Sequence, residues 1–149
     1  MNSKFKDYSA MHAQSVCLLT SNYISNPNTC TISSFSPISS DIAQDFFSFS
    51  LSNSGFMSTT IDLGVLVRIS LLRDTQSEVA KYFVAQRKEN VIYNLNEIWQ
   101  YLIGYINSEV ISYSRIGTSI LYIAKNLDIV INSKNEIPLI YRLRKYSLI

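Results

Sequence analysis

Short runs in which apolar residues alternate with small polar ones constrain this sequence most. In residues 46–51 (FFSFSL), the alternate positions Phe47, Phe49 and Leu51 fall on one face of a strand and the two serines on the other. This alternation is typical of a sheet with one buried face. Residues 29–35 (TCTISSF) alternate in the same way, and the short apolar run 16–20 precedes them. The sequence therefore predicts an antiparallel sheet with serine and threonine along one face.

Four later segments also have the composition of strands. They are rich in β-branched and aromatic residues and are bounded by turn-forming residues. These segments are 63–72, 99–113, 119–131 and the alternating tail 137–146. We expect 63–72 to lie centrally, because it is the most apolar. The turn residues at 115–118 predict that the two strands beside them run antiparallel, and 36–45 is expected to be a polar connection.

One segment changes from a period of two residues to the period of a helix. In residues 75–88, apolar and aromatic side chains recur at three- and four-residue spacings, with Thr75 as the expected N-cap and Glu78 completing a capping box. A shorter helix is expected over 59–64. With six or seven strands and one or two helices, the chain is predicted to be mostly β, an α+β protein or a Greek-key barrel.

Length and charge limit the classes of function. With 149 residues, the chain can build one core and not two, so we expect a single domain over residues 1–149. A net charge of +2 with scattered basic residues argues against a nucleic-acid partner. No apolar run is long enough to span a membrane, and the first residues lack the layout of a signal peptide, so we expect a cytoplasmic protein.

The sequence offers few residues for metal binding or nucleophilic catalysis. The two cysteines, Cys17 and Cys30, lie in apolar or threonine-rich segments and are predicted to be buried thiols. The single histidine, His12, is expected to have a structural or surface role. One histidine and two cysteines at this spacing do not predict a metal site.

Five segments, taken in order, resemble the flavin reductase-like domain family, the FMN-binding split barrels. They read TISSFSPIS, FFSFSLSNSG, GVLVRISLLRDTQSEVAKYF, GTSILYIAKNLDIVI and PLIYRLRKY. The family patterns are T-x-S-S-F-x-S-V-S, a strand ending in a serine-rich loop, V-N-x-L-x-x-x-Q-x-x-L-A-x-x-F, G-D-H-T-I-F-I-G-x-V and P-L-L-Y-x-x-G-x-Y. The likeness covers residues 15–146, and the ordered set is more specific than any single segment.

The resemblance implies a homodimeric split barrel that binds FMN or FAD near the dimer interface. It further implies hydride transfer from NADH or NADPH to the flavin, often to supply a partner monooxygenase. The family's flavin-contacting positions fall on Thr31, Ser33, Ser34, Ser36, Ser50, Ser52, Asn53 and Ser54. Short hydroxyl side chains suit a flavin, which carries many hydrogen-bonding groups and a phosphate. The alternative is that these hydroxyls form only the solvated face of an antiparallel sheet.

The sequence departs from the family at positions close to the expected site. Gly55 and Phe56 stand where the family often has serine followed by a cation, so the usual partner of the flavin phosphate is absent there. Ser119 replaces the histidine of G-D-H-T, and Arg144 replaces the glycine of the last segment. Arg68, Arg73, Arg87 or an arginine of the tail are the candidates to supply the missing charge.

Two hypotheses follow for the function. The first is an NAD(P)H:flavin reductase, and the second is a degenerate, non-catalytic split-barrel dimer that binds flavin weakly or not at all. A related barrel that uses heme or F420 is less favoured, because His12 lies outside the matched strands. The content of 10 Tyr, 7 Phe and 1 Trp favours a homodimer, since aromatic residues are enriched at interfaces. Candidate walls for a nicotinamide cleft, which core packing would equally explain, are Phe35, Phe56, Tyr82, Phe83 and Tyr146.

Overall fold

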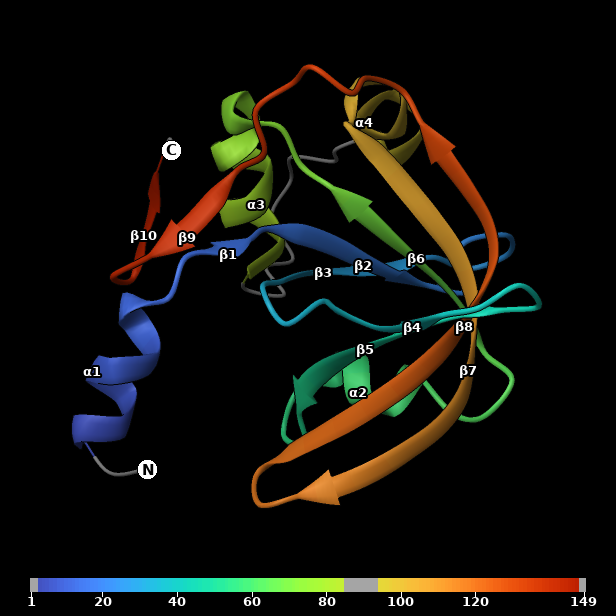
Figure 1. Cartoon of the computed structure of the whole chain (residues 1–149), viewed down its shortest axis with the longest axis horizontal. Helices are drawn as coiled ribbons and strands as arrows, with labels where there is room; N and C mark the ends of the chain where they lie inside the picture. The colour runs from blue at the N-terminus through green and yellow to red at the C-terminus, as the bar shows by residue number, and fades with distance from the viewer. Residues whose placement is uncertain (1–2, 85–93, 148–149) are drawn as a thin grey trace.

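A computed structural model describes residues 3–84 and 94–147, and it is dominated by one curled antiparallel sheet (Figure 1). The strands are β1 (Gln14–Ser15), β2 (Cys17–Ser21), β3 (Asn28–Ile32), β4 (Ser36–Ser40), β5 (Asp45–Ser52), β6 (Leu66–Leu71), β7 (Gly104–Ile116), β8 (Ser119–Ile131), β9 (Ile140–Arg142) and β10 (Lys145–Ser147). Seven of them form a sheet in the order β3-β2-β6-β7-β8-β5-β4, and β1, β9 and β10 form a small second sheet. The predicted mostly β fold is confirmed.

The order of the strands explains why the large sheet curls. β3 and β4 stand at its two opposite edges, yet only residues 33–35 separate them in the chain. Because three residues reach about 10 Å at most, one end of each edge strand must lie close to the other. The sheet therefore closes on itself as a barrel that is split between β3 and β4. The expected contact segment around Ser33 and Ser34 lies at this split.

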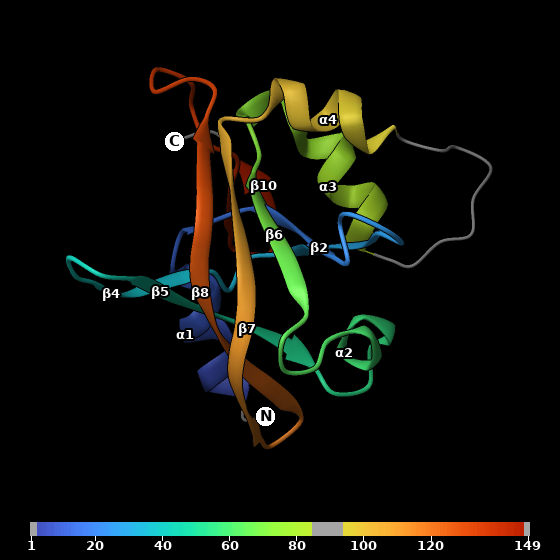
Figure 2. The same ribbon diagram turned by 90° about the vertical axis from the view of Figure 1, so that its right-hand side faces the viewer.

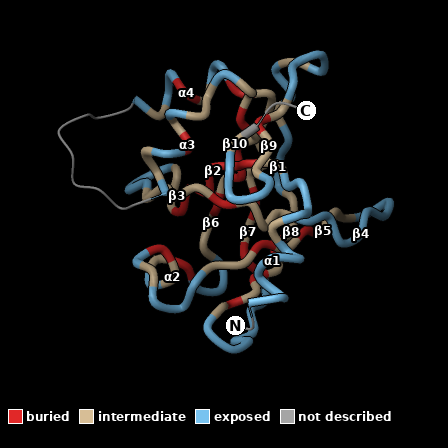
Figure 3. Tube along the Cα trace, turned by 90° about the vertical axis from the view of Figure 1, so that its left-hand side faces the viewer, coloured by how far each residue is buried: buried red, intermediate tan, exposed pale blue. Residues whose placement is uncertain are grey.

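Two hydrophobic clusters lie on either side of β2, which is buried along its whole length (Figure 3). Leu19 packs into the barrel interior, where Phe49 and Tyr122 stack with ring centroids 5.0 Å apart. Leu18 points to the other face and packs in the second cluster. The continuous apolar run of β2 is explained by this burial on both faces, and β6 is confirmed as a central strand between β2 and β7.

The described helices are α1 (Ser3–Met11), α2 (Phe56–Thr60), the 3₁₀ turn η1 (Asp74–Gln76), α3 (Ser77–Val84) and α4 (Leu95–Tyr101). Four α-helices thus replace the predicted one or two. Figure 2 shows α3 and α4 together over one end of the sheet, while α2 lies beside the lower part of β6. None of the helices in residues 3–84 and 94–147 has the length and hydropathy needed to cross a bilayer.

Three predicted elements need correction. Residues 36–40 form the edge strand β4 rather than a connection. Their backbone pairs with β5, and this pairing does not depend on the side chains, which are all exposed. The segment predicted as a strand from residue 99 begins as α4, since Asn94 caps that helix by accepting from the backbone N–H groups of Asn96 and Glu97. The short helix predicted over 59–64 lies earlier, as α2.

The beginning of the main helix also differs from the prediction. Thr75 does not cap it, because residues 74–76 form the turn η1, in which the Gln76 side chain accepts a hydrogen bond from the Arg73 backbone N–H at 2.8 Å. α3 then runs over Ser77–Val84, and residues 85–88 of the predicted helix lie outside the described residues.

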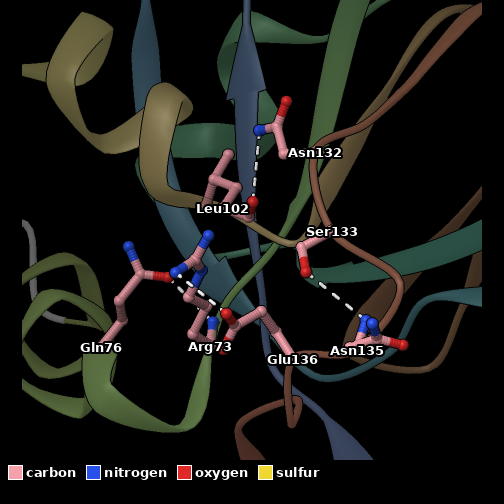
Figure 4. Close-up of polar contacts among 7 residues, drawn as sticks. All are labelled: Arg73, Gln76, Leu102, Asn132, Ser133, Asn135 and Glu136. Carbon is pink, nitrogen blue, oxygen red and sulfur yellow. Dashed lines mark hydrogen bonds and ion pairs between the residues drawn. The ribbon is translucent and has the colours of Figure 1, made fainter.

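Polar contacts fix the loop after β8 against α4 and η1 (Figure 4). The Asn132 side chain donates to the backbone oxygens of Trp99 and Leu102 at the end of α4, at 3.1 and 3.2 Å. Arg73 forms an ion pair with Glu136 at 3.5 Å. These contacts hold the loop at one end of the apolar cleft described below.

Candidate functional site

The split of the barrel brings the two expected contact segments together. The Ser34 hydroxyl donates to the backbone oxygen of Ser50 and accepts from its backbone N–H, both at 3.0 Å. These two hydrogen bonds therefore hold the segment after β3 against β5. Two residues that are 16 positions apart in the chain thus become neighbours, as the resemblance requires of a shared site.

The second segment forms an exposed turn at the end of β5. The hydroxyl groups of Ser52 and Ser54 lie 2.9 Å apart, and the Asn53 backbone N–H donates to Thr118. Ser52 pairs in register with Ser119, the position at which the family pattern has histidine. The substitution at Ser119 therefore lies beside the expected flavin-contacting loop.

A cavity of about 410 Å³ opens next to the first segment. Its walls combine the hydroxyl residues Thr31 and Ser33 of the split with Lys81 of α3 and Arg144 of the β9–β10 turn. The remaining lining residues are Val16, Ile32, Val84, Tyr141 and Tyr146. The volume lies in the range typical of small-molecule sites, which is roughly 300–1,000 Å³.

The expected hydroxyl groups differ in how far they are already engaged. Thr31 donates to the Ala80 backbone oxygen at 2.6 Å, and Ser34 both donates and accepts toward β5. Within the described residues, the Ser33 and Asn53 side chains make no hydrogen bond. Ser36 is exposed at the start of β4, and its hydroxyl donates to the Pro37 backbone oxygen at 3.5 Å. Ser33 is thus the hydroxyl of the cavity that is ready to bind a ligand.

Two tyrosines form the aromatic part of the wall of this cavity. The rings of Tyr141 and Tyr146 lie 5.2 Å apart, on the paired strands β9 and β10. Partial burial, and then the nearby Tyr141 hydroxyl, raise the pKa of Tyr146 above its ordinary value. The Tyr146 hydroxyl is therefore protonated at neutral pH and can donate a hydrogen bond.

The other candidate cations named from the sequence lie elsewhere. The Arg68 guanidinium lies 4.2 Å from the ring centroids of both Trp99 and Tyr105, and Arg73 pairs with Glu136. Arg87 lies outside the described residues. The arginine of the tail that lines the cavity is Arg144. Lys81 was not named from the sequence, because only the packing of α3 against β3 turns it toward Thr31.

A second cleft, of about 550 Å³, also reaches the crossing between β3 and β4 and is almost wholly apolar. Phe35, two residues after Ser33, forms one wall, and Ile129 and Ile131 of β8 form another. Of the other aromatic candidates, Phe56 is 54% exposed at the start of α2, and Phe83 packs at the margin of the second cluster.

The predicted thiols and the histidine are not among the lining residues of the cavity that holds Lys81 and Arg144, called the charged cavity below. Cys17 is buried and borders the apolar cleft, while Cys30 is partly buried. Burial raises the pKa of each thiol to about 12. His12 follows α1, and its ring contacts the Tyr8 ring edge to face, with the two ring centroids 5.0 Å apart. Within residues 3–84 and 94–147, no three histidine, cysteine or acidic side chains gather where they could hold a metal ion.

The curled antiparallel sheet, split between β3 and β4, is the fold that the resemblance to the flavin reductase-like domain family predicts. The model of the flavin reductase like domain matches residues 9–149, and the chain belongs to that family. No curated protein matches the sequence.

Solved structures share the fold at low sequence identity. A flavin reductase domain protein from Arthrobacter sp. FB24 superposes with a TM-score of 0.85 at 18% identity, covering 100% of this chain and 96% of that one. The styrene monooxygenase flavin reductase of Pseudomonas putida S12 superposes with a TM-score of 0.83 at 20% identity, covering 100% of this chain and 97% of that one. The NADH:FAD oxidoreductase of Streptomyces globisporus C-1027 superposes with a TM-score of 0.83 at 12% identity, covering 98% of this chain and 86% of that one.

Proposed function

We propose that this protein is an NAD(P)H:flavin reductase that transfers a hydride from a nicotinamide nucleotide to FMN or FAD. The observation that carries the proposal is the cavity at the split of the barrel. It combines an unengaged hydroxyl at Ser33, the cations Lys81 and Arg144, and two tyrosine rings in a chain of the flavin reductase family. This set of groups suits a ligand with a flat ring and a phosphate.

The residues of the chain would bind and orient the flavin, which itself supplies the redox chemistry when bound. Ser33 would hydrogen-bond the ligand from the cavity wall, and Ser52, Asn53 and Ser54 would present hydroxyl and amide groups from the exposed turn after β5. Thr31 and Ser34 would act mainly through their position, because their hydroxyl groups hold the split in shape.

The proposal includes a homodimer formed through the apolar cleft. Ile129 and Ile131 are 47% and 59% exposed on β8, and the apolar lining continues past Phe35 to Ile38 of the edge strand β4. Contiguous apolar patches of this kind are typical of protein interfaces. A second copy of the chain is the occupant we propose, because its matching cleft would cover the same side chains about a two-fold axis.

The proposed donor is NADH or NADPH, and the proposed consumer of the reduced flavin is a monooxygenase. The proposal of a monooxygenase partner is supported by the similarity to a protein that is named as the flavin reductase of a styrene monooxygenase. Ser119 stands in place of the family's histidine, so the proposed reaction does not depend on an imidazole at that position. Hydride transfer needs alignment of two rings more than a protein acid or base.

The second candidate function is a non-catalytic split-barrel dimer. It is favoured by the engagement of the Thr31 and Ser34 hydroxyl groups within the protein itself and by the loss of the loop cation at Gly55 and Phe56. In that case the cavity would be retained as a feature of the fold without a bound flavin.

A flavin titration separates the two candidates. Purified protein is titrated with FMN and with FAD while flavin fluorescence is followed, and NADH or NADPH is then added in air. Saturable binding together with nucleotide oxidation at a rate above that of free flavin supports the reductase. The absence of binding at tens of micromolar flavin would leave the non-catalytic dimer as the better account.

A further inference from the structure

The turn between β9 and β10 has an unusual backbone. Arg142 pairs with Lys145, so only Leu143 and Arg144 form the connection, and their φ angles are +51° and +60°. A two-residue hairpin with two positive φ angles is a type I′ turn, for which asparagine followed by glycine is strongly preferred. Neither residue here is of that kind.

Arg144 occupies the strained position where glycine would be relaxed. The family pattern ends P-L-L-Y-x-x-G-x-Y, and its glycine aligns with Arg144 in PLIYRLRKY. A side chain with a β-carbon destabilises the left-handed conformation. Such an outlier points to a function for the side chain when the surrounding structure holds it in place. Here the Leu143 N–H donates to the Ala10 backbone oxygen, which fixes the turn against α1.

The Arg144 side chain lines the charged cavity with Ser33 and Lys81. Within the described residues, both cations form ion pairs with exposed carboxylates alone. Arg144 Nη2 lies 3.0 Å from Asp7 Oδ1, and Lys81 Nζ lies 3.1 Å from Glu78 Oε1. Exposed ion pairs of this kind contribute little to stability, so a ligand with a higher negative charge can replace the carboxylates. Guanidinium groups bind phosphate through two parallel hydrogen bonds.

These two cations could replace the cation that is missing from the loop after β5. Gly55 and Phe56 leave that loop without a cation, and Arg68 and Arg73 are engaged elsewhere. We propose that Arg144, assisted by Lys81, binds a phosphate group of the nucleotide ligand, so that the phosphate subsite lies between α3 and the β9–β10 turn. This inference rests on the proposed flavin reductase function. The phosphate belongs either to the flavin or to the nicotinamide dinucleotide.

The test compares ligands with and without phosphate. FMN, riboflavin and NADH are titrated into the full-length wild-type protein and into Arg144→Gly, Arg144→Lys and Asp7→Asn. Arg115→Gln is the matched control, because it removes an equal charge from an exposed position at the far end of β7. The melting temperature of each variant is measured in parallel.

For a flavin phosphate, Arg144→Gly should weaken FMN binding about tenfold or more, as expected for a charge-assisted hydrogen bond, and leave riboflavin binding unchanged. Its melting temperature should not fall, because glycine relaxes the turn. Arg144→Lys should retain part of the affinity. Asp7→Asn should tighten FMN binding, whereas a merely structural Asp7–Arg144 pair predicts that both variants lose stability and affinity alike. Arg115→Gln should change nothing.

The arms of the experiment also separate the two sources of the phosphate. A tenfold weaker NADH affinity in Arg144→Gly with unchanged FMN affinity would assign the subsite to the dinucleotide. If the wild type binds FMN and NADH and Arg144→Gly changes both affinities less than twofold, the inference is overturned while the proposed function stands. A wild-type protein that binds none of the three probes would overturn both.

Discussion

The two cavities that meet the crossing between β3 and β4 differ sharply in chemistry. Ser33 lines a cavity with Lys81 and Arg144, whereas Phe35 lines a cleft with walls of isoleucine and leucine. Both residues belong to the three-residue crossing between β3 and β4. The difference teaches that one short segment can border two chemically different surfaces: Ser33 adds a hydroxyl group to a cavity with cations, and Phe35 adds an aromatic ring to an apolar cleft.

The largest expected effect is on the apolar side. Ile129→Asp should weaken the proposed dimer at least about a hundredfold, because a carboxylate without a partner would be buried at the interface. Sedimentation velocity over a range of micromolar concentrations measures the change. Ile24→Asp is the control, since Ile24 is 74% exposed in a loop away from the cleft. A wild-type protein that sediments as a 17.0 kDa species throughout that range would rule out the proposed dimer.

Gly104 tests how tightly the wall of the same cleft is built. A β-carbon at this position would lie 2.6 Å from the Val130 backbone oxygen, a distance that real structures do not show. Gly104→Ala should therefore lower the free energy of unfolding by about 1–3 kcal/mol through overpacking. Urea denaturation measures this value. Gly55→Ala is a suitable comparison, since its β-carbon would meet its nearest neighbour, the Ser52 backbone oxygen, at an ordinary 3.6 Å. Equal stability of the two variants would contradict the close approach of β7 and β8.

Two adjacent serines separate a structural role from a role in ligand binding. Ser34→Ala should lower the free energy of unfolding by about 1 kcal/mol, because it removes the hydroxyl that bridges to β5. Ser33→Ala should leave stability nearly unchanged and weaken FMN binding by about threefold to tenfold. Thermal melts and flavin titrations on the same samples give both values. The opposite assignment of effects would show that Ser34, not Ser33, contacts the flavin.

The smallest effect concerns the thiol at the apolar cleft. Burial raises the pKa of Cys17 from 9.0 to about 12, so the native thiol stays protonated and unreactive at pH 8. In Cys30→Ala, a chromogenic disulfide reagent should modify Cys17 only after denaturant is added. Because the folded pKa is the higher one, this thiol's contribution to stability is complete below pH 9 and declines as the pH rises toward 12. Rapid modification of the native variant at pH 8 would mean that the cleft opens.

Much of the fold follows from local patterns. The alternation in 46–51 predicts β5, and the apolar segment 63–72 predicts the central strand β6. The last turn of α4 was predicted as strand because Trp99 and Tyr101 are residue types enriched in strands, and the Asn94 cap and the burial of Ile98 decide for a helix. β4 was missed because its residues are polar and exposed, so its pairing with β5 leaves no hydrophobic pattern to read.

The sequence by itself determined that this chain forms a mostly β domain of the flavin reductase like family, because strand periodicity and ordered motifs are properties of neighbouring residues. It also marked Ser33 and its companions as candidates. Only the tertiary structure decided which hydroxyl groups are already engaged and which cations face the cavity. Lys81 and Arg144 are 63 positions apart in the chain. Their meeting depends on the packing of α3 against β3 and on the pairing of β9 with β1 and β10, and no local pattern encodes such long-range contacts.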